Sequence, residues 1–317
     1  MSGAALPPPS AGPRIAILMA TFQGEKYLAQ QLASITRQTH THWSLWISDD
    51  GSSDETLSII RDYAQRVGEH RVHLRKGPQR GATANFFSLL LDSAIDADYF
   101  ALADQDDLWY EDKLERAIRV LATSDMGATP ALYAGRVLWV NAHDEPIGTS
   151  RPLRRPLGLA HALTQNIAGG NTMVFNRAAR TLIQKAGEPS VPVHDWWIYL
   201  LLSASNASLH FDQQPTLRYR QHADNQIGAA LSWRQKYRRY HAIAQGQWRA
   251  WQNQHLAALQ SIQPLLPEQQ RQLIDNFSAW RHRPFWQRCL LAPQLGLYRQ
   301  YRLETLAFYM VGLLGLL

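Results

Sequence analysis

The stretch Phe100-Ala101-Leu102-Ala103-Asp104-Gln105-Asp106-Asp107-Leu108-Trp109 changes abruptly from apolar to acidic, with three carboxylates in four positions. Residues 99–103 form a short apolar run with aromatic residues at its start, which is typical of a strand buried on both faces. Residues 111–121 then have the apolar spacing of a helix. The carboxylates therefore lie where a strand has ended and a helix has not begun, which is where open α/β sheets bind ligands.

Three carboxylates this close together repel one another, so we expect a cation among them. Oxygen ligands favour Mg²⁺ or Mn²⁺, and two or three carboxylates leave coordination positions open for water or a substrate diphosphate. The alternative is a solvated acidic turn in which Asp107 caps the following helix. An Asp-x-Asp pattern alone does not separate the two interpretations.

Three earlier segments repeat the order of strand, polar loop and helix. The predicted strands cover residues 14–20, 43–48 and 72–75, and the polar segments after them cover 21–25, 50–54 and 80–85. Strands that alternate with helices imply right-handed crossovers and a mainly parallel sheet, so the polar segments should gather along one edge. The predicted fold class is α/β. The glycine patterns of dinucleotide-binding and P-loop proteins are absent from the sequence, which weakens both of those interpretations.

The composition of the 317-residue chain is that of a globular protein, with 45% hydrophobic residues and a formal net charge of +6. This charge suits a nucleotide, an anionic membrane or nucleic acid about equally well. The single cysteine, Cys289, excludes an intramolecular disulfide, so we expect a reducing, cytoplasmic environment. Residues 1–13 are small and rich in proline, as in a disordered arm, and no apolar run reaches the roughly 18 to 20 residues of a spanning helix.

Four linked motifs make the sequence resemble the inverting, nucleotide-sugar-dependent glycosyltransferases of family 2, particularly the bacterial branch that builds surface polysaccharides and includes rhamnosyltransferase-like members. The motifs are Met19-Ala20-Thr21-Phe22-Gln23-Gly24, Ile47-Ser48-Asp49-Asp50-Gly51-Ser52-Ser53-Asp54, Gly81 through Asn85-Phe86, and Ala103 through Trp109. Any one alone is a weak signal, but their order and spacing all agree.

The resemblance covers residues 14–228 and implies a GT-A fold, which is a Rossmann-like, mostly parallel sheet flanked by helices. Within it, residues 14–108 form the nucleotide-binding half and residues 109–228 the acceptor half. Residues 229–317 then form a helical C-terminal extension.

The resemblance also implies which residues bind the donor and the metal. Asp106 is expected to bind the Mg²⁺ or Mn²⁺ ion that bridges the donor phosphates, and His222 to provide another ligand. Asp50 should accept a hydrogen bond from the nucleotide base. The full expected donor set is Thr21, Phe22, Asp50, Arg80, Asn85 and Asp104. From the residues alone, Asp50 can also be an Asx-turn residue or a helix cap. The alternative for Arg80 is a solvated basic loop, and the alternative for His222 is a surface histidine.

On the acceptor side, the resemblance assigns the catalytic base to Asp195, whose pKa we expect to be near the ordinary value of about 4. The alternative role for Asp195 is a helix cap. Gly170 and Asn171 would approach the acceptor sugar, although a simple bulge explains the glycine nearly as well. Trp196 and Trp197 would stack on a sugar ring, or pack in the core.

The C-terminal region, from residue 231 onward, places arginine and lysine beside tryptophan and tyrosine and ends in the apolar segment 306–317. This composition suits either a membrane–water interface or helices that pack on the catalytic domain. The expected function is transfer of a sugar to a glycan or lipid-linked saccharide at the inner face of the plasma membrane.

Two other classes of function remain open. A sugar-nucleotide-forming nucleotidyltransferase shares the fold and metal, but normally has a glycine-rich, lysine-containing loop after the first strand. A non-catalytic binder of nucleic acid or membrane does not explain the acidic motifs. We therefore expect no nucleic-acid partner.

Overall fold

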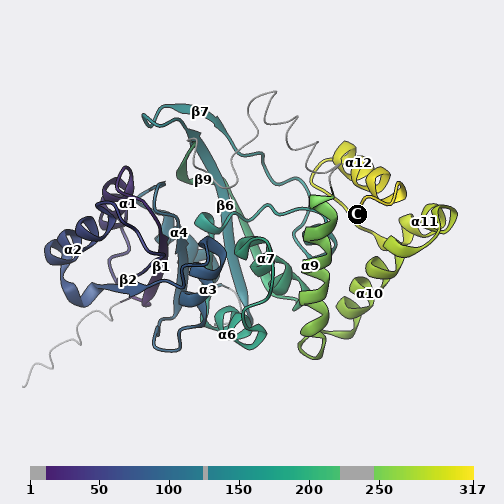
Figure 1. Ribbon diagram of the computed structural model, residues 1–317, viewed down its shortest axis with the longest axis horizontal. Helices are drawn as coiled ribbons and strands as arrows, with labels where there is room; N and C mark the ends of the chain where they lie inside the picture. Colours follow the sequence, from purple (N-terminus) through teal and green to yellow (C-terminus); the bar gives the residue numbers. More distant parts are fainter. Residues whose placement is uncertain (1–11, 124–127, 222–245) are drawn as a thin grey trace, which may run out of the picture.

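The computed structural model describes residues 12–123, 128–221 and 246–317 (Figure 1). In this part of the chain, nine strands form one sheet with the order β3-β2-β1-β4-β8-β6-β9-β5, and β7 pairs with β6 beside this path. Helices cover both faces of the sheet, which makes a three-layer α/β fold. The predicted class, a Rossmann-like sheet flanked by helices with further helices at the C-terminus, is confirmed.

The first half of the sheet is parallel. Its strands are β1 (Ile15–Thr21), β2 (Trp43–Asp49), β3 (Val72–Lys76) and β4 (Tyr99–Ala103). The register sets Thr21 opposite Asp49 and Met19 opposite Ala103, so β1, β2 and β4 end at the same edge. The polar segments that follow these strands meet there, as predicted.

The second half of the sheet is mixed. The strands are β5 (Leu108–Trp109), β6 (Ala131–Val140), β7 (Pro146–Thr149), β8 (Val174–Asn176) and β9 (Ser208–Arg220). β8 is antiparallel to both β4 and β6, whereas β6 and β9 are parallel. β9 continues as one strand past Pro215, because a bulge there absorbs the irregular residues and lets the pairing with β6 continue.

Alternating side chains along the strands build two apolar layers, one on each face of the sheet. Ile15, Ile17 and Met19 pack with α1, α2 and α4, whereas Ala16 and Leu18 face α3, α6 and α7. The helices are α1 (Leu28–Thr36), α2 (Thr56–Val67), α3 (Ala82–Leu91), α4 (Lys113–Leu121), α5 (Leu159–Ala162), α6 (Arg177–Ala186) and α7 (His194–Ala204).

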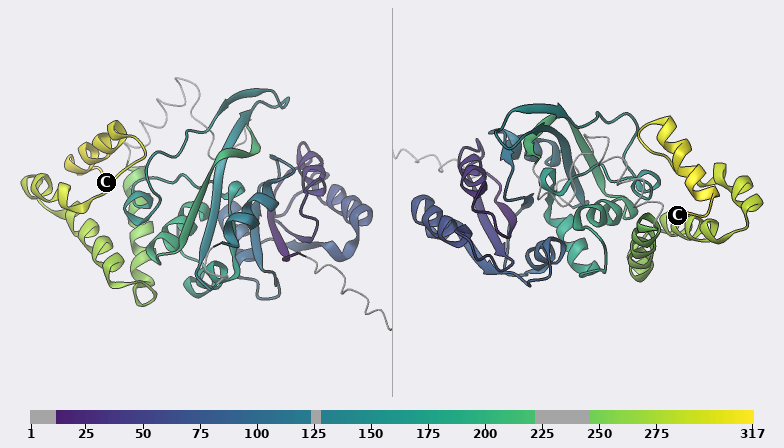
Figure 2. Two further views of the ribbon diagram at one scale, coloured as in Figure 1. Left: turned by 180° about the vertical axis from the view of Figure 1, so that it is seen from behind. Right: turned by 45° about the horizontal axis from the view of Figure 1, so that its top comes forward.

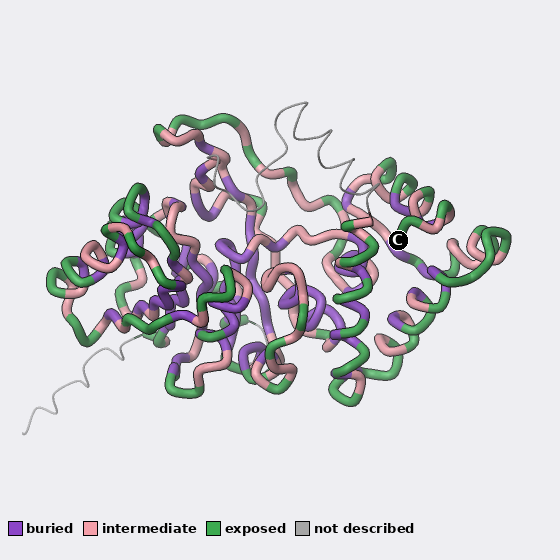
Figure 3. The backbone as a smooth tube through the Cα atoms, viewed as in Figure 1, coloured by how far each residue is buried: buried purple, intermediate pink, exposed green. Residues whose placement is uncertain are grey.

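The C-terminal helices are α9 (Gln247–Ser261), α10 (Glu268–His282), α11 (Phe285–Leu291) and α12 (Arg302–Leu313). α9, α10 and α12 extend the layer formed by α3 and α7, because Leu259, Phe277 and Phe308 belong to the same apolar cluster. Figure 3 shows buried and exposed residues alternating along α9, so that one face of this helix packs inward, whereas α11 has no buried residue and α12 has only two. None of the described helices has the length and apolar character needed to cross a membrane.

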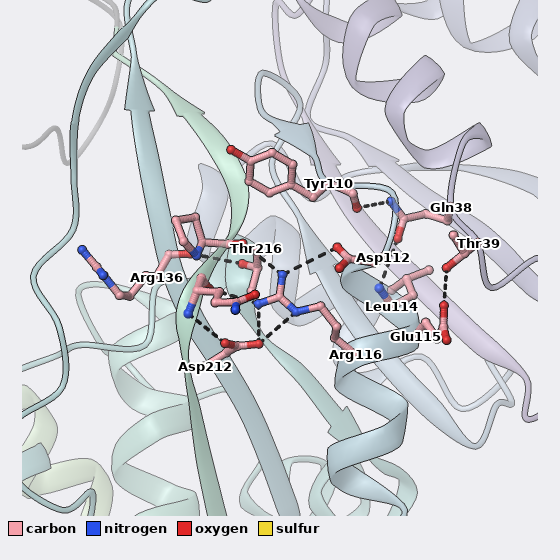
Figure 4. A network of polar contacts seen from close by, with 12 residues as sticks. Gln38, Thr39, Tyr110, Asp112, Leu114, Glu115, Arg116, Arg136, Asp212 and Thr216 are labelled. Carbon is pink, nitrogen blue, oxygen red and sulfur yellow. Dashed lines mark hydrogen bonds and ion pairs between the residues drawn. The ribbon is translucent and has the colours of Figure 1, made fainter.

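A polar network fixes the start of α4 between α1 and β9 (Figure 4). Arg116 donates from Nε to Asp212 at 3.0 Å and from Nη1 to the Pro215 carbonyl at 3.1 Å. On the other side, the Gln38 amide donates to the Tyr110 carbonyl at 2.8 Å and accepts from the Leu114 amide at 3.1 Å. Residues 110–116, which connect the acidic motif to α4, are therefore fixed by β9 on one side and by Gln38, just after α1, on the other.

Candidate active site

One cleft of about 1360 Å³ opens at the carboxyl ends of β1, β2 and β4. It extends past the short 3₁₀ turn η3 (Gly170–Thr172) and the start of α7 to reach α9. Its lining includes Thr21, Phe22, Asp50, Asn85, Asp104, Asp106, Gly170, Asn171, Asp195 and Trp196. The fold thus brings most of the predicted site residues to one cavity.

The acidic motif forms a compact cluster at this cleft, in which Asp104 and Asp106 line the cavity and Asp107 is buried next to them. Asp104, Asp106 and Asp107 each place one carboxylate oxygen within 4.8 Å of the others. Burial, followed by repulsion from Asp106, raises the pKa of Asp104 to about 7 and raises that of Asp107 well above its ordinary value. A divalent cation would relieve this repulsion, so the three residues fit the expected metal.

Asp107 belongs to this cluster and does not cap a helix, because α4 begins only at Lys113. Its side chain is buried, and Oδ2 accepts a hydrogen bond from Asn171 Nδ2 at 2.6 Å. Oδ1 has no hydrogen-bond partner among the described residues. A buried carboxylate oxygen without a donor is costly, so Asp107 is a further candidate ligand.

The amine of Lys113 is buried beside the cluster. Its Nζ donates to the Asn171 carbonyl at 2.5 Å and lies 3.4 Å from the centre of the Trp109 ring. Burial lowers the pKa of Lys113 well below its ordinary value, although the nearby Asp107 and Asp104 carboxylates oppose this shift. Sequence reasoning missed this residue, although Lys113, Ala117 and Leu121 share the inward helical spacing of α4.

Arg220 holds the backbone of the acidic motif in place. Its guanidinium donates to the carbonyls of Asp106 at 3.2 Å and Ala142 at 2.9 Å, and to Gln30 Oε1 at 2.7 Å. It also lies 4.5 Å from the Tyr27 ring centre. The predicted metal ligand His222 falls two positions later, outside the described residues, so its role remains a prediction.

On the donor side, the predicted residues tie the strand ends together. Thr21 Oγ1 donates to Asp49 Oδ2 at 2.9 Å, and Asn85 Nδ2 donates to the Ser48 carbonyl at 2.8 Å. Asp49 also accepts from the amides of Gly51 and Ser52, so the Asx turn considered for Asp50 belongs to its neighbour.

Asp50 instead links two loops at the edge of the cleft. Its carboxylate accepts the backbone amides of Gln79 at 2.6 Å and Gly81 at 2.8 Å. Arg80, between them, is not in the cleft lining, and its guanidinium pairs with Glu188 at 2.9 Å on the surface. The prediction that Arg80 approaches the diphosphate is therefore not supported, because a surface carboxylate engages it outside the cleft.

Gln105 was not singled out from the sequence, yet it joins the first and fourth polar segments. Its side-chain amide accepts from the Phe22 backbone N–H and donates to the Phe22 carbonyl, both at 2.9 Å. A Cβ at Gly24 would lie 2.5 Å from Gln105 Oε1, so a larger residue there would displace the Gln105 side chain from Phe22. The exposed Phe22 ring is held at the cleft entrance by this pair.

Asp195 lies at the second position of α7 and faces the cleft. Its Oδ2 accepts the Gly170 amide at 3.1 Å, and Oδ1 accepts the Trp196 amide at 2.6 Å. Burial raises its pKa to about 6, and these hydrogen bonds limit the rise. The expectation of an ordinary value near 4 was wrong, because the sequence does not show the protein that surrounds the carboxylate.

Gly170 and Asn171 support the neighbouring acidic residues. A Cβ on Gly170 would lie 2.7 Å from His194 Nε2, so α7 can approach η3 only if this residue is glycine. Asn171 contacts Asp107 through its side chain and Lys113 through its carbonyl. η3 therefore connects Asp195 to the acidic cluster.

The two adjacent tryptophans have different surroundings. Trp196 lines the cleft, and its Nε1 donates to the Ala162 carbonyl at 2.8 Å. Trp197 is 0% exposed and packs in the core, which corrects its prediction as an acceptor-binding residue.

Comparison with known proteins identifies the family to which this arrangement belongs. A sequence profile described as glycosyl transferase family 2 matches residues 16–179, which is more than half of the chain. The chain belongs to glycosyltransferase family 2. It is therefore an enzyme that transfers a sugar, as its motifs indicated.

Among family 2 relatives, the chain is 32% identical over 238 residues to the dTDP-rhamnosyl transferase RfbG of Shigella flexneri, covering 70% of this chain and 77% of the relative. The putative teichuronic acid biosynthesis glycosyltransferase TuaG of Bacillus subtilis is 28% identical, covering 34% of this chain and 42% of the relative.

Solved structures confirm the fold. S. aureus TarS 1-349 in complex with UDP-GlcNAc matches with a TM-score of 0.55 at 13% identity, covering 94% of this chain and 90% of the TarS 1-349 chain. The mannosyltransferase PcManGT of Pyrobaculum calidifontis, in complex with GDP-Man and Mn²⁺, matches with a TM-score of 0.51 at 18% identity, covering 95% and 86%. At these identities, the likeness concerns the fold.

Proposed function

We propose that the enzyme moves a sugar from a nucleoside-diphosphate sugar to a glycan or lipid-linked saccharide in surface polysaccharide synthesis, with inversion at the anomeric carbon. The observation that carries this proposal is that one cleft holds both a metal-type acidic cluster and a separate carboxylate, Asp195. Asp195 is close enough to Asp104 to raise its pKa. The relation to RfbG favours dTDP-rhamnose as donor, with UDP-sugars as the other candidates.

The proposed reaction is one displacement at the anomeric carbon. An acceptor hydroxyl oxygen forms the new bond to this carbon, the bond to the nucleoside diphosphate breaks, and Asp195 takes the hydroxyl proton. The Gly170 and Trp196 amides hold the Asp195 carboxylate in place. Asp104, Asp106 and Asp107, with His222 as a further candidate, would hold Mg²⁺ or Mn²⁺, which supplies positive charge to the leaving diphosphate. Family membership disfavours the nucleotidyltransferase alternative.

Binding of nucleotide sugars tests the proposed donor. We expect dTDP-rhamnose or a UDP-sugar to raise the unfolding temperature only when Mg²⁺ or Mn²⁺ is present, because the diphosphate and the acidic cluster are both anionic. A ligand at a hundred times its Kd stabilises the native state by about 2.7 kcal/mol. Thermal-shift measurements with dTDP-rhamnose, UDP-GlcNAc and GDP-mannose, each with and without metal, would check this. If none of these ligands produces a shift, the proposed function is contradicted.

The raised pKa of Asp195 predicts the pH dependence of transfer. Only the deprotonated carboxylate can accept a proton, so the rate should rise with pH and level off above about pH 6. Well below this value, each pH unit should lower the rate about tenfold. Single-turnover transfer measured from about pH 5 to pH 8 would show this acidic limb. A limb centred near pH 4, the ordinary value for aspartate, would contradict the burial argument.

We also propose that the enzyme works in the cytoplasm at the inner face of the plasma membrane, with α11 and α12 contacting lipid. Of the twelve large exposed apolar side chains in the described residues, eight lie between residues 285 and 316. Leu303, Leu306, Met310 and Leu314 form one outward stripe, while Phe308 faces the core. Residues 281–317 contain five arginines and one acidic residue, Glu304, which suits an anionic surface.

Vesicle co-sedimentation tests this membrane contact. We expect the protein to bind phosphatidylglycerol vesicles in a salt-sensitive manner, and the double variant Leu303→Glu, Leu306→Glu to lose most of this binding. Ile147→Glu, at an exposed apolar position on β7, is the matched control. Point variants are better than truncation because α12 also packs on Trp280 through Gly312. Equal binding by both variants and the native chain would contradict the contact.

A further inference from the structure

Three indoles form a wall at the end of the cleft nearest α9. Trp196 comes from α7, and Trp248 and Trp251 come from α9. The ring centre of Trp196 lies 5.4 Å from that of Trp248 and 6.3 Å from that of Trp251. These three residues, called the indole wall below, all line the cleft.

The wall is held rigidly from behind. His255 lies one helical turn after Trp251, and its ring centre is 4.6 Å from that of Trp196. Gln252 Nε2 donates to the Leu163 carbonyl at 3.0 Å, which fixes α9 against the segment after α5. Trp196 is itself oriented by its bond to the Ala162 carbonyl. A ligand would therefore meet a surface that needs little ordering on binding.

Trp248 and Trp251 differ from the tryptophans of the core. Both are only partly buried, and neither indole nitrogen is among the buried polar atoms without a partner. By contrast, the buried Trp280 donates its Nε1 hydrogen to the Arg288 carbonyl at 2.9 Å. The wall thus presents flat apolar faces next to accessible N–H groups, the combination that suits a molecule with apolar C–H faces and hydroxyls.

The size and layout of the cleft leave room for such a ligand beside the donor. Its volume of about 1360 Å³ exceeds the roughly 300 to 1,000 Å³ of a typical small-molecule site. The donor-side residues lie at the ends of β1, β2 and β4, whereas α9 lies beyond α7 (Figures 1 and 2). Asp195 directly precedes Trp196 in the chain, so the proposed base lies between the two regions.

We infer that the indole wall is a binding subsite for a pyranose ring of the acceptor saccharide. This inference rests on the proposed function and adds residues of α9 to the acceptor side. The polar side chains of Gln165 and Asn166 line the same part of the cavity, which favours a saccharide over a lipid chain. The ring would stack on Trp248 and Trp251 while one of its hydroxyls faces Asp195.

Binding of simple glycosides tests the subsite. The probes are methyl α-L-rhamnoside, methyl β-D-galactoside and methyl β-D-N-acetylglucosaminide, titrated by NMR. The protein is first saturated with Mg²⁺ and with either dTDP or UDP, and Mn²⁺ is left out. We expect at least one to bind the native protein at millimolar concentration. Trp248→Leu and Trp251→Leu should each weaken its binding on the order of three- to tenfold, because the flat ring and N–H are lost while apolar bulk remains.

Trp286→Leu is the matched control, because Trp286 is 61% exposed on α11 and does not line the cleft. It should bind the glycoside as the native protein does, and nucleotide affinity should be unchanged in all three variants. Trp251→Phe keeps an aromatic ring, so it should lose less affinity for the glycoside than Trp251→Leu. If Trp251→Leu does not fold, Trp251→Phe is measured in its place.

The outcomes separate the subsite from the proposed function. If the native protein binds nucleotide but none of the glycosides, or if the leucine variants bind as tightly as the native protein, the subsite is overturned and the proposed function stands. If the native protein does not bind nucleotide, the proposed function fails and the subsite fails with it.

Discussion

Asp195→Asn is expected to lower the rate of transfer by a factor on the order of 10² to 10⁴ while nucleotide-sugar binding is retained. Asparagine has the same size, and its carbonyl oxygen can still accept one of the two amides, from Gly170 or from Trp196, which bond to different oxygens of Asp195. It cannot take the proton from the acceptor hydroxyl. The loss should therefore appear in kcat, because the proton transfer belongs to the chemical step.

The measurement is steady-state transfer together with calorimetric titration of the donor in the presence of metal. Asp62→Asn, at an exposed position on α2 outside the cleft, is the matched control and should leave both quantities unchanged. The acidic limb of the pH profile should also disappear from any residual activity of Asp195→Asn. Transfer within a few-fold of the native rate would show that Asp195 only supports the start of α7.

Asp106→Ala is expected to abolish transfer and metal-dependent nucleotide binding. Asp106 belongs to the acidic cluster, while Arg220 holds its backbone carbonyl, so the loop should keep its path without the side chain. Asp106 also raises the pKa of both Asp104 and Asp107. Removing it relieves repulsion, so the metal-free variant should unfold at a temperature no lower than the native protein.

Calorimetric titration of Mn²⁺ and then of the nucleotide sugar would check this result. Glu111→Ala is the matched control, because this exposed acidic residue lies five positions later in the chain and its side chain pairs with Arg37 on the surface. It should leave metal and donor binding unchanged. If Asp106→Ala retains its affinity for the donor in the presence of Mn²⁺, Asp106 is not a ligand.

The sequence predicted the parallel half of the sheet well because its signals are local. Each of β1, β2 and β4 is a short apolar run that ends in a polar segment, and parallel connection then places these ends at one edge. Asp104, Asp106, Thr21, Asp50 and Asn85 could therefore be assigned to one cleft before any contact was known. His222 remains a prediction, since it lies outside the described residues.

Two other predictions are not supported by the structure, in each case because the side chain had two plausible neighbours. The sequence predicted that Arg80 approaches the diphosphate and that Trp197 stacks on a sugar ring. In the structure, Arg80 pairs with Glu188 on the surface and Trp197 is completely buried. Both cases depend on the direction in which the side chain points. Whether a loop or helix residue faces the cleft depends on its backbone conformation, which motif spacing does not fix.

The sequence by itself determined the fold class, the family and the chemical types of residue at the cleft, because periodicity and motif order are properties of the chain. Only the tertiary structure decided that Lys113 lies buried against Asn171, that Gln105 bridges two loops and that α9 adds Trp248 and Trp251 to the cleft. Each of these contacts joins residues far apart in the chain. Burial, and with it the raised pKa of Asp195, arises only when such distant segments pack around one group.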